Sequence, residues 1–257
     1  SQLTATIATM DKLSLASPDI TDRERELVLQ VLHTPILSGG PMVERFEAMA
    51  AACSHRQHAV ATSSGTAALH LIVRALGLGP GDAVITTPFS FVASANCLLY
   101  EGVEPVFVDI EDETYNLDPD KVLEVLRIRS DLRDRVKGIL AVDVFGHPAE
   151  WARLEAIAQE YGLLLIEDSA EALGSTYHGQ PAGSFGNAGV FAFYPNKQIT
   201  TGEGGVVLTD DDEMAELCRS LRNQGRGPSN EWLEHVRLGY NYRLSELHAA
   251  LGVAQLE

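Results

Sequence analysis

The sequence predicts an α/β fold with three layers, in which helices cover both faces of a mainly parallel central sheet. Segments such as Leu163–Ile166 are continuously apolar instead of alternating, which is typical of strands that are buried on both faces. Strand-like and helix-like segments also alternate along the chain. The length of 257 residues and the hydrophobic content of 45% suffice for one large domain of this class.

The first two expected helices carry start signals. The run Thr21-Asp22-Arg23-Glu24 has the pattern of a capping box, which opens a helix that extends to about Leu32. Pro41 stands where a first helical residue would, and Met42–Cys53 follows with a helical pattern. These segments therefore predict two helices ahead of the sheet.

The remaining elements alternate, with bounds set by turn residues and apolar periodicity. Strands are expected at His58–Thr62, Ala83–Thr87, Pro105–Asp109, Gly138–Val142, Leu163–Glu167, Val190–Phe193 and Gly205–Thr209. Helices are expected near Thr66–Leu76, Ser90–Tyr100, Asp118–Ile128, Ala149–Tyr161, Asp211–Asn223 and Ser245–Leu256. In such sheets ligands bind beyond the carboxyl ends of the strands, so residues that follow strands are the candidates for chemistry.

Composition argues against several classes of partner. With 19 basic and 36 acidic residues the net charge is −17, which disfavours nucleic acid and anionic membranes. The three cysteines include no C-x-x-C pair and the eight histidines show no ligand spacing, so no metal site is expected. The N-terminus lacks the basic-then-apolar pattern of a signal peptide, so we expect a cytoplasmic protein.

Three segments after expected strands hold candidate site residues. In the first, Ser63-Ser64-Gly65-Thr66, a glycine lets the backbone approach a ligand and free N–H groups at a helix start attract phosphate. An ordinary turn with a serine or threonine cap explains the same residues.

The second segment is Ile166-Glu167-Asp168-Ser169-Ala170-Glu171, where two acids follow a buried strand directly. A carboxylate in that place is costly unless a cation or hydrogen-bond donors face it. A helix N-cap at Asp168 is the alternative explanation.

The third segment surrounds Lys197, in Phe193-Tyr194-Pro195-Asn196-Lys197-Gln198. The chain has four lysines against 15 arginines. Lysine can lose its proton and form an imine, which arginine cannot do. A solvated loop lysine is the alternative. A phosphate cradle, a buried aspartate and a lysine are together the parts that pyridoxal phosphate requires, because the aspartate keeps the pyridine nitrogen protonated and the lysine holds the aldehyde.

The sequence resembles the DegT/DnrJ/EryC1/StrS family of sugar aminotransferases from about Leu37 onward. The matching motifs are Leu37-Ser38-Gly39-Gly40-Pro41, Ser64-Gly65-Thr66-Ala67-Ala68-Leu69, Thr87-Pro88-Phe89-Ser90-Phe91-Val92-Ala93-Ser94-Ala95-Asn96, Glu167-Asp168, Lys197 to Gly205, and Gly239-Tyr240-Asn241-Tyr242-Arg243-Leu244. The resemblance implies a large domain like that of type I aspartate aminotransferases, and pyridoxal 5'-phosphate as cofactor.

The family's residue roles transfer where residues match. Lys197 would hold the cofactor and shuttle the proton, and Asp168 would pair with the pyridine nitrogen. The remaining implied contacts are Gly65 and Thr66 with the phosphate, Phe91 stacked on the ring, Glu171 near the 3-hydroxyl where many relatives have Gln, and Asn241 at the phosphate of the neighbouring subunit's cofactor. The site therefore implies a homodimer.

Two features depart from the family pattern. Relatives usually carry a phosphate-binding serine five residues before the lysine, where this chain has Ala192. Relatives also continue into a smaller C-terminal domain. We expect residues 1–36 to form an N-terminal helical arm and residues 37–257 to form the large domain, without that small domain.

The resemblance implies transfer of an amino group from glutamate to a nucleotide-linked keto-6-deoxy sugar, in the biosynthesis of polysaccharide or antibiotic sugars. The run from Thr200 to Gly205 is more similar to members that act at C-4 than at C-3. Arg226, Arg237 and Arg243 are candidates for binding the diphosphate, since the acidic chain offers no diffuse attraction. An ordinary surface charge is the alternative explanation for each of them.

Three alternatives remain open at this point. A sugar dehydratase with the same fold would carry histidine in place of Lys197. A non-catalytic cofactor-binding fragment would fail to turn over glutamate. An unrelated nucleotide-binding oxidoreductase would need a glycine fingerprint after a strand, whereas the glycines of residues 77–81 follow an expected helix.

Overall fold

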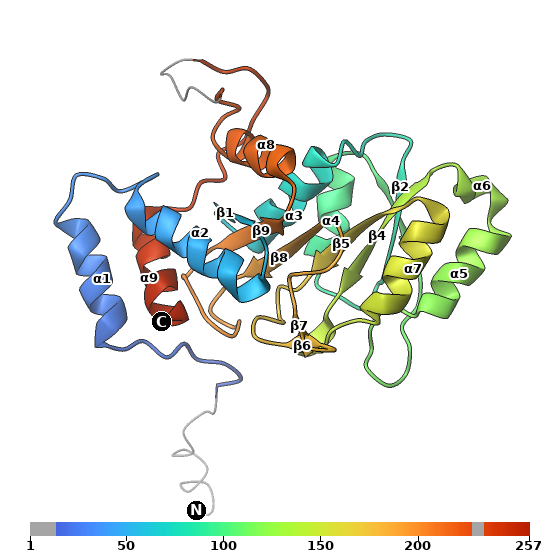
Figure 1. Ribbon diagram of the computed structural model, residues 1–257, viewed down its shortest axis with the longest axis horizontal. Coiled ribbons are helices and arrows are strands. Elements are labelled where there is room, and N and C mark those ends of the chain that lie inside the picture. Colours follow the sequence, from blue (N-terminus) through green and yellow to red (C-terminus); the bar gives the residue numbers. More distant parts are fainter. Residues whose placement is uncertain (1–13, 228–233) are drawn as a thin grey trace, which may run out of the picture.

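The computed structural model describes residues 14–227 and 234–257, and a seven-stranded sheet forms its centre (Figure 1). The strands lie in the order β1-β9-β8-β5-β4-β2-β3. They are β1 (His58–Thr62), β2 (Ala83–Thr86), β3 (Glu104–Phe107), β4 (Val136–Val142), β5 (Leu164–Asp168), β8 (Ala188–Ala192) and β9 (Gly205–Thr209). A separate hairpin consists of β6 (Thr176–Tyr177) and β7 (Gln180–Pro181).

The sheet is mainly parallel, as the sequence predicts. Strands β8, β5, β4, β2 and β3 pair in parallel, whereas β9 pairs antiparallel with both β1 and β8. The connection from β8 to β9 is residues 193–204 and forms no helix, so it returns the chain without the crossover that a parallel strand needs. The carboxyl ends of β1, β2, β4, β5 and β8 therefore meet at one edge, together with the start of β9.

Helices cover both faces of the sheet, which confirms the three layers (Figure 1). One face packs against α3 (Gly65–Ala75), α4 (Ala93–Tyr100) and α8 (Asp212–Arg222). The other face packs against α1 (Asp22–Leu32), α2 (Pro41–Ser54) and α9 (Glu246–Leu256) at one end, and against α5 (Pro119–Ile128), α6 (Ser130–Arg133) and α7 (Trp151–Tyr161) at the other.

The predicted start signals of the first two helices are confirmed. The Thr21 hydroxyl accepts from the backbone at the start of α1, and the Glu24 carboxylate accepts from the Thr21 backbone N–H, so the capping box is complete. Pro41 occupies the first turn of α2. Helix α1 buries Leu27 and Val31 in the same apolar cluster as α2 and α9, so this part of the expected arm packs on the large domain. Residues 1–13 lie outside the described residues.

The helix expected at residues 90–100 begins later, at Ala93. Residues 89–92 form bends and a turn instead, with the Ser94 N–H donating to the Phe91 carbonyl. Phe91 consequently lies in a turn, and its side chain is 76% exposed. Helix α6 and the β6–β7 hairpin were not predicted from the sequence, because elements of two to four residues are too short to carry a periodic pattern.

No helix in the described part of the chain combines the length and the apolar character that crossing a bilayer requires.

Candidate active site

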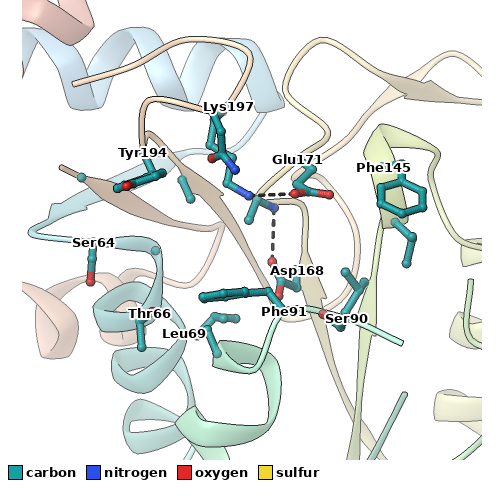
Figure 2. Close-up of a pocket in the computed structure, with 18 of the residues that line it drawn as sticks. Ser64, Thr66, Leu69, Ser90, Phe91, Phe145, Asp168, Glu171, Tyr194 and Lys197 are labelled. Carbon is teal, nitrogen blue, oxygen red and sulfur yellow. Dashed lines mark hydrogen bonds and ion pairs between the residues drawn. The ribbon is translucent and has the colours of Figure 1, made fainter. Parts of the chain in front are cut away.

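A cavity of about 610 Å³ lies at the edge where the parallel strands end. Its walls come from the segments after β1, β2, β4, β5 and β8, and from the residues just before β9. Lys197, Asp168, Glu171, Thr66 and Phe91 all line it (Figure 2). The three segments that the sequence singled out therefore converge on one site, as expected for ligand binding at the carboxyl ends of such strands.

Lys197 lies in the connection from β8 to β9 and points into this cavity (Figure 2). Its side chain is 14% exposed, and Nζ donates to Glu171 Oε1 at 2.9 Å. In contrast, Lys121 pairs with Asp109 at 3.3 Å at the surface and Lys137 is exposed. Lys12 lies outside the described residues. Lys197 is thus not a solvated loop lysine, and its amine is available to a ligand in the cavity.

Asp168 is the last residue of β5 and its carboxylate is buried at the cavity wall. It accepts from Ser94 Oγ at 2.7 Å and from the Ala170 N–H at 3.2 Å. Burial raises the pKa of Asp168, and these hydrogen bonds and the charge of Lys197 only partly oppose it. No helix begins after Asp168, so the alternative of a helix cap is wrong. A buried carboxylate that faces a cavity favours a cationic group in a ligand.

The start of α3 forms a concave wall of the cavity. Ser64 is the N-cap of α3, and its hydroxyl accepts from the Ala67 N–H at 3.1 Å, so the capping explanation of this residue is correct. A Cβ on Gly65 would lie 2.6 Å from the Ala192 Cβ, so only glycine fits there. The cap leaves the helix's first N–H groups at the cavity wall, which is the arrangement that binds phosphate.

Phe91 and Glu171 take positions that suit the flat ring of a ligand. Figure 2 shows the Phe91 ring beside Asp168, and the Glu171 carboxylate beside the Lys197 amine to which it is hydrogen-bonded. Ala192 also lines the cavity, next to Gly65, so the position where relatives usually have serine does face the site. The loss of a phosphate contact there stays a prediction.

Asn241 does not line the cavity of its own chain and is exposed. Its neighbours Tyr240 and Tyr242 are stacked at 5.0 Å between ring centroids and face inward. Tyr242 Oη lies 3.0 Å from His70 Nδ1, and Tyr240 Oη donates to Glu101 Oε1 at 3.0 Å.

His70 and Glu101 join these two tyrosines into one partly buried network. The Nε2 atom of His70 lies 2.8 Å from Glu101 Oε1, and burial raises the pKa of Tyr240 to about 12. Because successive side chains of an extended segment alternate in direction, the anchored tyrosines turn Asn241 outward. Its contact with a neighbouring subunit stays a prediction.

The three arginines suggested for a diphosphate do come together, but around a second cavity. Arg226, Arg237 and Arg243 line a cavity of about 740 Å³ that shares no wall residue with the first. Arg219 and Arg222 line it too, with the carboxylates of Glu44, Glu47, Glu213 and Glu216. The Arg243 guanidinium donates to Asn223 Oδ1 at 3.0 Å.

Several residues in the cavity wall or next to it were not predicted from the sequence as site residues. The most informative is Ser94, which is buried next to the cavity wall: its hydroxyl donates to the Asp168 carboxylate and lies 2.7 Å from Ser90 Oγ. A spacing of four residues in the motif from Thr87 to Asn96 was the available signal. Tyr194, Asn196, Glu203, Phe89 and Phe145 also line the cavity.

The cavity fits pyridoxal phosphate. The buried Asp168 carboxylate and the Lys197 amine both face it, the start of α3 forms part of its wall, and the Phe91 ring lies beside the carboxylate. The volume is also in the range of cofactor pockets, roughly 300–1,000 Å³. Among the described residues, no group of three histidine, cysteine or acidic side chains is placed to bind a metal ion.

Comparisons with known proteins match one family over nearly the whole chain. A model of the DegT/DnrJ/EryC1/StrS aminotransferase family matches residues 18–257. GDP-perosamine synthase of Caulobacter vibrioides is 41% identical over 96% of the chain, and the chain spans 65% of its length. The UDP-N-acetyl-3-dehydro-alpha-D-glucosamine 3-aminotransferase of Acidithiobacillus ferrooxidans is 42% identical over 80% of the chain and 53% of its own length. A putative sugar aminotransferase of Streptococcus pneumoniae, solved in its PLP form, superimposes with a TM-score of 0.89 at 30% identity, over 96% of this chain and 66% of that one.

Proposed function

Because the chain belongs to the DegT/DnrJ/EryC1/StrS aminotransferase family, we propose that it transfers an amino group from glutamate to a keto carbon of a nucleotide-linked 6-deoxy sugar, with pyridoxal phosphate as cofactor. The observation that carries the proposal is the convergence of Lys197, Asp168 and the start of α3 on one cavity. A dehydratase of this fold is disfavoured, since lysine stands where such enzymes have histidine.

The proposed roles follow from the contacts of each side chain. When bound, pyridoxal phosphate supplies an electron sink for the carbon that loses a proton. The Lys197 amine would hold the cofactor at its aldehyde carbon and, once free, would move a proton to and from the donor's α-carbon. Asp168 would keep the ring nitrogen protonated, and the Ser94 hydroxyl holds the Asp168 carboxylate in place by a hydrogen bond of 2.7 Å.

Reduction with borohydride tests the role of Lys197. Adding pyridoxal phosphate to the purified chain is expected to produce a new visible absorption band, and borohydride is expected to fix the label on the peptide that contains Lys197. Lys197→Ala removes the amine and is expected to abolish amino transfer even where cofactor still binds. A label on Lys12, Lys121 or Lys137 would contradict the assignment of Lys197 as the residue that holds the cofactor. Glutamate turnover by the wild-type chain distinguishes the enzyme from a non-catalytic cofactor-binding fragment.

We further infer that the working unit is a homodimer in which Asn241 reaches the cofactor phosphate of the neighbouring subunit. Support comes from the outward direction of Asn241, which Tyr240 and Tyr242 impose by their bonds to Glu101 and His70. The arginine-lined cavity adjoins this segment, since Asn223 pairs with Asn241 and Arg243 follows it closely. In a dimer the same contact would bring these arginines to the partner's substrate, where they suit a diphosphate.

Mixed dimers test the shared site. Subunits with Lys197→Ala and subunits with Asn241→Ala are each expected to be nearly inactive. A mixture refolded together is expected to recover up to about a quarter of wild-type activity, because half of the dimers then hold one complete site of two. A mixture no more active than its two components, or a protein that is monomeric by light scattering yet binds cofactor tightly, would contradict the shared site.

The sugar specificity is the most detailed part of the proposal. The residues from Thr200 to Gly205 favour C-4 of the sugar, whereas one relative of 42% identity is a 3-aminotransferase. Protein whose cofactor carries the amino group is therefore to be mixed separately with nucleotide-linked 4-keto and 3-keto sugars and with the free keto sugar. We expect the cofactor spectrum to return to the aldehyde form with the 4-keto nucleotide sugar alone. Equal conversion by free sugar, or conversion by simple keto acids only, would indicate an amino-acid aminotransferase.

A further inference from the structure

Three aromatic side chains are exposed together at the mouth of the cavity and form what we call the aromatic rim: Phe89, Tyr115 and Phe145. Their exposed fractions are 41%, 49% and 76%. The ring of Phe89 lies 5.8 Å from that of Tyr115 and 6.0 Å from that of Phe145, between centroids. Phe89 and Phe145 line the cavity, whereas Tyr115 lies beyond its wall, so the rim runs outward from the site.

The rim is built rigidly. Tyr115 and Phe145 both have left-handed backbones, with φ of +64° and +54°, a conformation that costs a bulky side chain energy. The side chain of Asn116, buried next to Tyr115, holds the two segments together. Its Oδ1 accepts from the Val144 N–H at 2.9 Å and its Nδ2 donates to the His147 carbonyl at 3.0 Å. The surrounding structure therefore holds two large rings in water at an energetic cost.

The charges in the cavity restrict what the rim can bind. Among the residues that line the cavity, Lys197 is the one cation, against three carboxylates, those of Asp168, Glu171 and Glu203. A diphosphate thus finds little attraction there. The rim itself offers aromatic faces, which suit a flat, uncharged and polarisable group.

We propose that the aromatic rim binds the base of the nucleotide in the substrate by stacking. The inference rests on the proposed function and deepens it. In a nucleotide-linked sugar the reacting sugar and the base stand at opposite ends of the diphosphate. A keto carbon at Lys197 places the sugar inside the cavity, and the base then lies towards its mouth, where Phe145, Phe89 and Tyr115 follow one another outward.

Binding of nucleoside diphosphates to the cofactor-loaded protein tests the rim. The probes are GDP, UDP and dTDP, with pyrophosphate as a probe that lacks the base. Phe145→Asn removes the ring and leaves a residue that tolerates the left-handed backbone, so the variant is expected to fold. Affinity for at least one nucleotide is expected to fall by about 5- to 150-fold, the range of base-stacking losses, and affinity for pyrophosphate to stay within about twofold.

Two matched variants serve as controls. Phe145→Tyr keeps the ring and is expected to bind nucleotide as the wild type does. Ile128→Asn removes an apolar side chain of similar exposure, 67%, at the end of α5 outside the cavity wall. This variant is expected to bind nucleotides and pyrophosphate as the wild type does.

Different measurements test the role of the rim and the proposed function. The visible spectrum with cofactor, the reaction with glutamate and the turnover of nucleotide sugar by the wild type test the function without any change at the rim. Nucleotide affinity of Phe145→Asn within about twofold of wild type would overturn the rim as the base site, as would absence of nucleotide binding by the wild type. Unchanged nucleotide affinity with a shift to monomer by light scattering would assign the rim to an interface between copies instead.

Discussion

Two buried acids beneath the candidate site are expected to share one proton, and this can be tested by substitution. Asp143 and Glu167 have no exposed surface, and Ser169 Oγ lies between them, 2.8 Å from Asp143 Oδ2 and 2.6 Å from Glu167 Oε1. The serine hydroxyl has one hydrogen and can donate to one of the two oxygens. We therefore expect one acid to be protonated and to donate to the serine.

Burial is the main cause that raises the pKa of both acids, and the negative charge of Asp143 raises that of Glu167 further. The folded protein therefore keeps a proton that the unfolded chain releases above about pH 4. The stability that the pair contributes is full below that pH and is lost as the pH rises through the folded-state pKa values. One extra bound proton corresponds to a slope of about 1.4 kcal/mol per pH unit.

Asp143→Asn preserves every hydrogen bond of the pair. Asp143 Oδ1 accepts from the Ala149 N–H and from Trp151 Nε1, which an amide oxygen can also do. The new amide donates to Ser169, which then donates to an ionised Glu167. We expect a free energy of unfolding within about 1 kcal/mol of wild type at pH 5. Above that pH the free energy of unfolding of the variant should rise relative to that of the wild type, by at most about 1.4 kcal/mol per pH unit, since the like charge is gone.

Glu167→Gln is the contrasting variant. Both oxygens of Glu167 accept backbone N–H groups, from Gly183 at 2.6 Å and from Phe185 at 2.8 Å. A glutamine has one oxygen, so one buried N–H loses its acceptor at a cost of about 1–3 kcal/mol. Urea unfolding followed by circular dichroism between pH 5 and 8.5, on cofactor-free protein, measures both variants. Asp143→Asn less stable than Glu167→Gln at pH 5, or a difference from wild type that is the same at every pH, would refute the shared proton.

Two further substitutions probe the cofactor contacts. Asp168→Asn keeps the shape but removes the charge that holds a proton on the ring nitrogen, so amino transfer is expected to fall far more than cofactor content, and near-normal turnover would refute that role. Gly205→Ala places a Cβ 2.5 Å from the Gly65 nitrogen and from the Ser64 carbonyl carbon, so the start of α3 must shift. Its cofactor affinity, measured by absorbance titration, is expected to fall by about tenfold or more, in line with overpacking costs of about 1–3 kcal/mol. Wild-type affinity would show that this wall does not hold the phosphate.

The sequence by itself determined most of the longer elements and the three segments of the site, because both depend on local chemistry. The capping box at Thr21 and the proline that opens α2 are read from neighbouring residues, and the structure confirms both. The apolar run that ends at Asp168 places an acid at a strand end, wherever that strand lies. The scarcity of lysine likewise singled out Lys197 before its position in space was known.

Only the tertiary structure decided how distant segments face one another. That Ser94 fixes Asp168, that Asp143 lies against Glu167, and that Phe89 approaches Phe145 are contacts across 20 to 80 positions of sequence. Such contacts depend on the order of strands in the sheet, which the pattern within each strand does not specify. The same holds for the outward turn of Asn241, because the buried partners of its neighbouring tyrosines, and not its own sequence context, set its direction.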